Sequence, residues 1–272
     1  TFIGTPGEGY AHRNFTYLQL AIGTIIARIV IAFTFLKPYY DYNVYSIYEF
    51  LKVRFGPRAR NAASAVFLVT RVLASGTRLY ISAVILVLAY ELLAGARPDQ
   101  NEELLIYIGA ITVVTVLTAV YTTFGGIKAV IWTDMIQATI MMGSALVAIG
   151  LLYAGIPGGI EEIGRRLAAP GDLRFIDAGV EPARTWWANA RSILESEYTI
   201  WAGILGSTFT TMATHGTDQD MVQRMLTAKD VRRSRLSLVL SGLADIPIVL
   251  VFLTLGILLW VHFHTNPDPD RK

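Results

Sequence analysis

The sequence contains no cysteine at all, and charged residues make up only 16% of its 272 residues. The missing cysteine excludes disulfides, zinc–thiolate sites and cysteine catalysis. The low charge separates the chain from an ordinary soluble domain, in which roughly a quarter of the residues are charged. Hydrophobic residues make up 53% of the chain. This composition favours a membrane protein.

Charge is also missing from long stretches, each long enough to cross a ~30 Å hydrocarbon core, for which ~20 residues are needed. Residues 104–127, 135–160 and 198–217 carry no charge, 14–36 carries only Arg28, and 236–261 carries only Asp245. The pattern predicts an all-α, polytopic membrane helix bundle that forms a single transmembrane domain over 1–272. We predict six spans, at 15–36, 61–92, 105–123, 129–154, 198–215 and 236–261.

The distribution of basic residues predicts the orientation of these spans. Alternating crossings place 37–60, 124–128 and 216–235 on one side, with eleven lysine and arginine residues against five acids. Because basic residues gather on the cytoplasmic side, we expect these segments to be cytoplasmic, in a bacterial inner membrane. The segment 155–197 is then an extracytoplasmic loop, and 45–56 an amphipathic helix at the inner interface.

In the outer loop, residues 158–167 have the pattern of a short interfacial helix. Trp186 and Trp187 are typical of the headgroup level. The chain opens at Thr1 on what resembles the exit of a hydrophobic element, so we expect it to be part of a longer membrane protein.

Asp134 lies in a sequence apolar enough to enter a membrane, where a carboxylate costs a few kcal/mol unless a cavity, a partner or a cation receives it. A carboxylate there is a functional-site hypothesis by default. A hard cation prefers oxygen ligands, and Thr133 and Gln137 could add oxygens nearby. The alternative is a structural carboxylate bonded to helix-end amides or to Lys128.

Arg78 lies near the middle of the second predicted span, next to Thr77. A guanidinium at this depth should face the bundle interior, and it suits a bidentate grip on a carboxylate. The alternative is an internal salt bridge, to Asp245 or Glu91. Arg71 lies on the same face, and for it we favour a structural role.

Four segments carry a resemblance to a known family. They read TPGEGY at 5–10, YEFLKVRFG at 48–56, YTTFGGIKAVIWTDMIQ at 121–137 and GTDQDMVQRMLTAK at 216–229. In these motifs the chain resembles the sodium:solute symporter family. The resemblance implies a LeuT-type inverted-repeat fold, sodium coupling, and a piece that runs from the outer end of core helix 1 through core helix 7. The main sodium site would then involve helices outside this sequence.

The resemblance also implies roles for single residues. The family's aspartate that matches Asp134 is associated with sodium passage or a secondary sodium site, and sialic-acid-type relatives bind the substrate carboxylate through an arginine in the region of Arg78. Sugar-type members carry an acid in the first span, and this chain has none between 14 and 36. Gln19 and Thr24 remain as candidates to line the solute cavity. Arg28 lies deeper in this span, and we expect it to pair internally or to reach the inner interface.

The fifth predicted span departs from the family's sugar-type pattern. Thr214 and His215 stand where those relatives have an aromatic inner gate, which favours a different substrate. His215 is a candidate for solute binding, although a lone histidine is more often structural. Thr211 and Thr214 belong to a run of hydroxyl residues that either lines the cavity or bonds back to the preceding helical turn.

Three further features favour structural roles. The family's strongest inner motif is marked by Asp218, Gln219, Gln223 and Arg224, which should cap and tie a helix end. Gly125 and Gly126 should form a tight turn. Asp245, two residues before Pro247, favours a salt bridge over a proton site.

We therefore predict a sodium-coupled symporter of a small organic solute that carries a carboxylate. Its partners are the solute, Na⁺ and the bilayer, with no nucleic acid and no cofactor other than the coupling ion. The alternative is a transporter-like sensor domain. An enzyme is not expected, because the spans hold no nucleophile motif or metal cluster.

Overall fold

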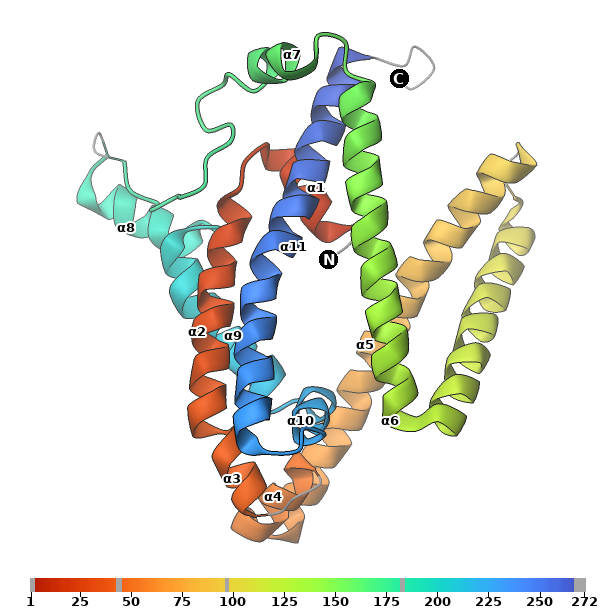
Figure 1. Cartoon of the computed structure of the whole chain (residues 1–272), viewed down its shortest axis with the longest axis vertical. Coiled ribbons are helices and arrows are strands. Elements are labelled where there is room, and N and C mark those ends of the chain that lie inside the picture. Colours follow the sequence, from red (N-terminus) through yellow and green to blue (C-terminus); the bar gives the residue numbers. More distant parts are fainter. Residues whose placement is uncertain (1–2, 43–45, 96–97, 182–183, 267–272) are drawn as a thin grey trace. The chain divides into compact units, whose positions relative to one another are not determined.

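The computed structural model describes residues 3–42, 46–95, 98–181 and 184–266. In these ranges the chain forms helices and no strand, which confirms the predicted all-α class. The α-helices are α1 (Gly4–His12), α2 (Gln19–Thr34), α3 (Leu36–Asp41), α4 (Ile47–Phe55), α5 (Pro57–Ala94), α6 (Gln100–Ala154), α7 (Gly159–Arg166), α8 (Trp186–Glu195), α9 (Ser207–Gly216), α10 (Gln219–Leu226) and α11 (Val231–Thr265). A short 3₁₀ turn, η1 (Thr16–Leu18), precedes α2, and a π-helix, η2 (Ala202–Gly206), precedes α9 (Figure 1).

Four segments of the described chain are helical, long and apolar enough to cross a membrane: Thr16–Asp41, Pro57–Ala94, Gln100–Ala154 and Val231–Thr265. The first, second and last each contain one predicted span, and the third contains two. The predicted span 198–215 corresponds to η2 and α9, whose helical residues are fewer than the ~20 of a straight crossing. The six-span count stays a prediction.

The chain divides into two compact units. Unit 1 comprises Thr1–Phe50 and Ile140–Lys272, and unit 2 comprises Leu51–Thr139. The candidate residues predicted from the sequence are divided between the two units.

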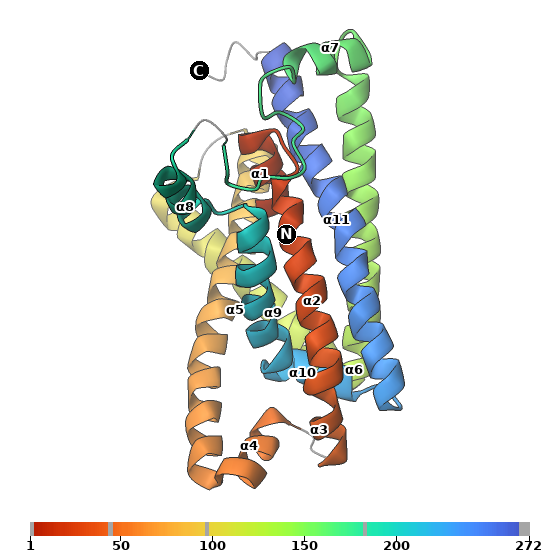
Figure 2. The ribbon, with the colours of Figure 1, turned by 90° about the vertical axis from the view of Figure 1, so that its left-hand side faces the viewer.

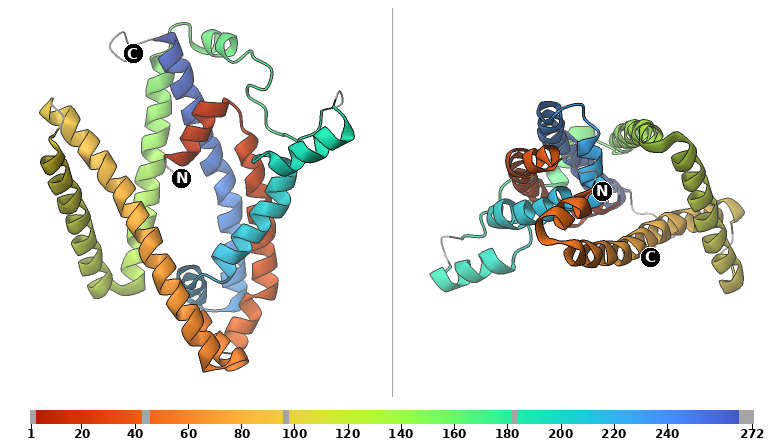
Figure 3. Two further views of the ribbon diagram at one scale, coloured as in Figure 1. Left: turned by 180° about the vertical axis from the view of Figure 1, so that it is seen from behind. Right: turned by 90° about the horizontal axis from the view of Figure 1, so that it is seen from below.

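In unit 1, α2 lies between α9 and α11, and α1 packs on α11 (Figures 2 and 3). Glycines allow α2 to approach η2 closely. A Cβ added to Gly23 would meet the carbonyl oxygen of Gly203, and one added to Gly203 would meet the backbone of Gln19. Small residues at such crossings let membrane helices pack backbone to backbone.

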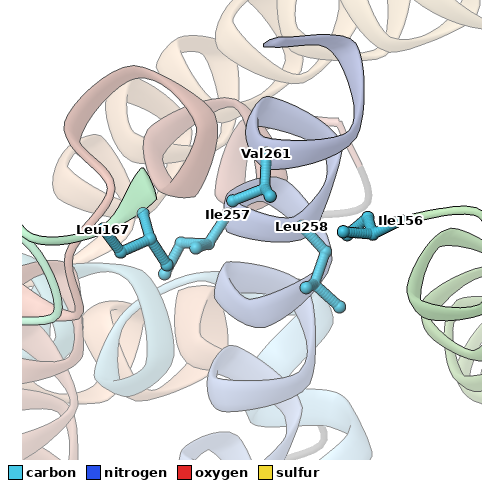
Figure 4. Close-up of a cluster of buried hydrophobic side chains, with 5 residues drawn as sticks. All are labelled: Ile156, Leu167, Ile257, Leu258 and Val261. Atoms are coloured by element: carbon cyan, nitrogen blue, oxygen red, sulfur yellow. The ribbon is translucent and has the colours of Figure 1, made fainter. Parts of the chain in front are cut away.

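Hydrophobic clusters pack against α11 near both of its ends. At its C-terminal end, the buried residues are Ile156, Leu167, Ile257, Leu258 and Val261 (Figure 4). Toward its N-terminal end, Leu238 packs with Ile31, Ala32 and Leu36 of the α2–α3 segment. The two clusters fix both ends of α11 within unit 1.

One end of unit 1 brings together two segments that the sequence predicts to share a side of the membrane. The Tyr39 hydroxyl donates to the carbonyl of Gly216 at 2.9 Å, and the backbone N–H of Ile47 donates to Oε1 of Gln219 at 3.0 Å. The Asp218 side chain caps α10 by accepting from the N–H of Asp220 at 2.9 Å. The predicted capping and tying role of Asp218 and Gln219 is confirmed.

The predicted outer loop contains two short helices. α7 falls within the predicted 158–167, and its Glu162 carboxylate lies 2.8 Å from Nε of Arg166 and 2.5 Å from NH2 of Arg165. These hydrogen bonds, with that from Arg165 the largest cause, lower the pKa of the Glu162 carboxyl. Trp186 and Trp187 open α8 as an exposed, stacked pair. Exposed aromatic rings of this kind suit a headgroup region.

Unit 2 contains the last residues of α4, all of α5 and α6 as far as Thr139. Tyr80 of α5 stacks on Tyr107 of α6, with ring centroids 5.6 Å apart. α6 is broken at Gly126, whose φ of 58° and ψ of −158° are non-helical, and its ribbon turns back on itself (Figure 1). Only glycine adopts such dihedrals without strain, so the predicted glycine turn is confirmed.

Candidate functional site

The three predicted ion-path residues lie together on α6, about two helical turns beyond the break at Gly126. Asp134 and Thr133 are half-buried, and Gln137 is exposed. Residues three and four apart share a helix face, so Gln137 is a neighbour of both. The Thr133 hydroxyl donates to the carbonyl of Val130 at 2.9 Å, which leaves its oxygen lone pairs free to accept or to bind a cation.

The predicted carboxylate grip lies on α5, also in unit 2. Arg78 and Thr77 are exposed, and the Thr77 hydroxyl donates back to the carbonyl of Leu73 at 3.1 Å. Within the described part of unit 2, the Arg78 guanidinium has no acid within ion-pair distance, so the alternative of a salt bridge to Glu91 is not formed there. Asp245, the other alternative partner, belongs to unit 1.

Asp245 instead pairs with Arg28, and this confirms the predicted salt bridge. The distance between NH1 of Arg28 on α2 and Oδ2 of Asp245 on α11 is 2.7 Å. The Arg28 side chain is 9% exposed and that of Asp245 36% exposed. The guanidinium is therefore buried between helices of unit 1, and the carboxylate is only partly covered.

His215 on α9 completes this group. Its Nε2 lies 3.4 Å from NH2 of Arg28, and its Nδ1 lies 3.0 Å from the Thr214 hydroxyl. Arginine only donates, so Nε2 must accept and Nδ1 carries the proton. The chain of donors continues from the Thr214 hydroxyl to the carbonyl of Thr210 at 3.0 Å. Arg28 thus links α2 to both of its neighbours.

Gln19, predicted to line the solute cavity, is 3% exposed and fully engaged with backbone groups. Its amide nitrogen donates to the carbonyls of Thr16 at 3.2 Å and Tyr198 at 2.9 Å. Its Oε1 accepts from the N–H of Asp177 at 3.2 Å. These bonds tie the start of α2 to the chain before α9.

Thr24 does line a cavity, of about 190 Å³, in unit 1. Its polar lining also includes Thr5, Tyr17 and Asp245. The Thr24 hydroxyl donates to the carbonyl of Ala21 at 2.9 Å. Thr24 and Asp245 are therefore brought together at one cavity.

The hydroxyl run of α9 serves mainly to bind helices together. Ser207 donates to the carbonyl of Leu20 at 2.8 Å, and Thr208 donates to those of Gly23 and Ile204. Thr211 is buried and Thr214 bonds back within α9; neither lines the cavity beside Asp245. Both interpretations of the run were open from the sequence, and back-bonding accounts for Thr208 and Thr214.

The sequence predicted a salt bridge for Asp245 and internal pairing as one alternative for Arg28, but it did not link these two residues to each other or to His215. One signal was available: Arg28 is the only charge in residues 14–36, and Asp245 is the only charge in 236–261. Two lone charges of opposite sign in apolar helices favour a mutual pair, since each reduces the cost of burying the other.

Comparison with known proteins shows to which family the chain belongs. The sequence model of the sodium:solute symporter family matches residues 1–267. The chain belongs to the sodium:solute symporter family. The chain is 29% identical to the human sodium-coupled monocarboxylate transporter 1 over 99% of this chain and 40% of that protein.

Two further relatives extend the comparison. The sodium/sialic acid symporter SiaT of Proteus mirabilis (strain HI4320) is 27% identical over 98% of this chain and 49% of its own length. The human sodium/iodide cotransporter is 25% identical over 98% of this chain and 37% of its own length. The chain spans less than half the length of these curated relatives.

The fold agrees with a solved structure. A Na⁺-coupled sialic acid symporter in a substrate-bound, outward-open state matches with a TM-score of 0.77 and 24% identity, over 100% of this chain and 52% of that one. The LeuT-type fold that the motifs imply is confirmed. Together with the long apolar helices, the family makes the chain part of an integral, multi-pass membrane protein.

Proposed function

We propose that the protein is a sodium-coupled symporter that moves a small organic solute by alternating access. The observation that carries this proposal is the family match over residues 1–267, together with relatives named as sodium-coupled monocarboxylate and sialic acid transporters. Sodium that enters down a 100 mV potential releases about 2.3 kcal/mol per charge. That energy, with the sodium concentration gradient, would drive solute uptake.

Asp134 is the proposed ion-path residue, with Thr133 and Gln137 beside it. Its support is its position: a half-buried carboxylate in a largely apolar part of α6, with a hydroxyl and an amide oxygen on neighbouring positions. A carboxylate and a sodium ion each reduce the other's desolvation cost, and hard cations prefer such oxygen ligands.

Arg78, with Thr77, is the proposed grip on the solute carboxylate. Its support is an exposed guanidinium, without an ion-pair partner in the described residues, at mid-length of an apolar helix. Thr24 is proposed to line the solute cavity in unit 1. For Gln19, Thr211, Thr214 and His215 the observed bonds favour a positioning role around that cavity rather than direct contact.

The sensing alternative gains no support, because the relatives named above are transporters. The same names favour transport over enzymatic activity. The cytoplasmic placement of 37–60, 124–128 and 216–235 remains part of the proposal.

The test is uptake by the full-length protein in proteoliposomes, with a sodium gradient compared to an equal potassium gradient. Sodium-dependent accumulation of a monocarboxylate or an acidic sugar is expected. Asp134→Asn should raise the sodium concentration for half-maximal uptake about tenfold, the loss expected for one charge-assisted contact. Glu161→Gln, which changes an exposed carboxylate on α7, is the matched control and should leave it unchanged. An unaltered sodium requirement in Asp134→Asn would remove Asp134 from the ion path.

A further inference from the structure

The cavity in unit 1 is lined by polar groups that come from three separate parts of the fold. Thr5 belongs to α1, Tyr17 and Thr24 to the η1–α2 segment, and Asp245 to α11, with Leu20 and Ile248 among the apolar walls. At about 190 Å³ it is smaller than the roughly 300–1,000 Å³ of complete small-molecule sites. A cavity of this size suits one part of a solute.

Asp245 is part of the lining of this cavity, and Arg28 forms an ion pair with its carboxylate from outside the lining. Its Oδ2 lies 2.7 Å from NH1 of Arg28, and the side chain keeps 36% of its surface exposed. Arg28 itself is not part of the lining. Gly242 makes the arrangement possible, because a Cβ at that position would lie 3.1 Å from Cδ and 3.2 Å from NH1 of Arg28.

The cavity is therefore rich in acceptors but has no net charge. Asp245 supplies a carboxylate oxygen, and the Thr24 hydroxyl has already donated its hydrogen to Ala21, which leaves its lone pairs. Arg28 cancels the charge of Asp245, so a bare cation gains little there. An anion would face the carboxylate first. A neutral hydroxyl or N–H group can donate to the carboxylate, and it is neither repelled like an anion nor dependent on a net negative charge like a cation.

We propose that this cavity is a subsite for a hydroxyl or N–H group of the transported solute, with Asp245 as the accepting residue and Arg28 as its positioning residue. The inference rests on the proposed transport function and narrows its substrate class. The solute would be a hydroxylated or amide-bearing organic anion. A halide, or a short carboxylate with no further polar group, would leave the Asp245 oxygen without a donor.

The test compares matched solutes on the full-length protein. Binding is measured by titration calorimetry in sodium for two pairs, lactate with propanoate and 3-hydroxybutanoate with butanoate. The hydroxylated member of at least one pair should bind about tenfold more tightly, as expected for one hydrogen bond to a charged group. Equal affinity within both pairs would overturn the proposal.

The decisive variant is Arg28→Met combined with Asp245→Leu. It removes the acceptor without leaving a buried charge, and such apolar replacement of an ion pair is often tolerated. The hydroxyl preference, measured as the ratio of the two affinities within a pair, should fall to within about twofold. A preference that survives in this variant would also overturn the proposal.

Two further variants separate this role from general stability. Arg191→Met with Glu195→Leu alters an exposed Arg–Glu pair of 2.8 Å on α8 and should keep the full preference. Arg28→Lys keeps a cation beside Asp245 and should keep the preference within about threefold. The proposed transport function fails on a different readout, namely absence of sodium-driven uptake of all four solutes, so the two failures are distinguishable.

Discussion

Arg28 and Asp245 show how one pair of side chains holds two membrane helices together. Each is the only charge in a long apolar stretch, and they meet at 2.7 Å. Removing one partner of such a pair leaves the other charge uncompensated, at a typical cost of roughly 3–5 kcal/mol. Because Asp245 is partly exposed, we expect the lower end of that range for Arg28→Met alone.

Gln19 offers a test of whether a buried amide is structural. Gln19→Leu keeps the volume but leaves the N–H of Asp177 and the carbonyl of Tyr198 without this partner. We expect a loss of about 1–3 kcal/mol in unfolding free energy, measured by thermal unfolding of the full-length protein in detergent. Gln100→Leu, at an exposed position at the start of α6, should change it by less than about 0.5 kcal/mol. If the Gln19 variant loses solute affinity but no stability, the positioning role is wrong.

Arg78 is tested by a substitution that keeps its charge. A lysine cannot form the paired hydrogen bonds of a guanidinium with a carboxylate. Arg78→Lys should therefore weaken the binding of anionic solutes about tenfold, measured by calorimetry in sodium. Arg60→Lys, exposed near the start of α5, is the control. Unchanged affinity in Arg78→Lys would argue against the grip.

At the scale of single residues, charged side chains that are expensive to bury in a membrane could be predicted from the sequence, but their ion-pair partners could not. A charge in an apolar stretch is visible in the sequence, which is how Asp134, Arg78 and the Asp245 salt bridge were predicted. The partner of Asp245 was not predicted, because the sequence offered Arg78 as a possible partner and left Arg28 without a named one. Only the packing of α2 on α11 selects Arg28.

At the scale of elements, the close contact between α2 and η2 depends on glycine. Gly23→Ala would bring a Cβ to 2.8 Å from the Ser207 Cβ and onto the carbonyl of Gly203, which is backbone and cannot rotate away. We expect a loss of about 1–3 kcal/mol in unfolding free energy, from overpacking. Gly143→Ala on α6 meets nothing within 4 Å and should be neutral or stabilising by up to ~1 kcal/mol. Equal thermal unfolding of the two variants would contradict this packing.

Most elements could be predicted from the sequence because apolar length is a strong signal. Residues 105–123 and 129–154 were separated by their glycine pair, and α6 is broken there at Gly126. The segment 198–215 was less well predicted. It is carried by a π-helix followed by a ten-residue α-helix, and hydropathy does not report the widened turn of a π-helix.

At the scale of the whole molecule, the orientation can be tested with introduced cysteines, since this chain has none of its own. In a full-length background without other cysteines, Lys128→Cys and Lys229→Cys should react with a membrane-impermeant maleimide only from the cytoplasmic side. Arg165→Cys, exposed on α7, should react only from the opposite side. Labelling of Arg165→Cys and Lys229→Cys from the same side would contradict the six-span topology.

The division of the chain into two units was not predicted. The sequence indicated one transmembrane domain, because hydropathy shows which segments enter the bilayer but not which of them pack together. The packing of unit 1 joins the first fifty residues to those after 139 through contacts such as Ser207 to Leu20. Such distant pairs leave no periodic signal in the sequence.

The pairing of α2 with distant helices also bears on how the protein is made. Arg28 enters the membrane with α2, but His215 follows it by 187 residues, and Asp245 comes later still. At roughly 5–20 residues per second, synthesis of that interval takes about 10–40 s. Inserting the guanidinium into the bilayer costs ~2.5–3.5 kcal/mol. During this time the apolar residues around Arg28 must offset that cost. The insertion of α2 therefore precedes the contact that later stabilises it.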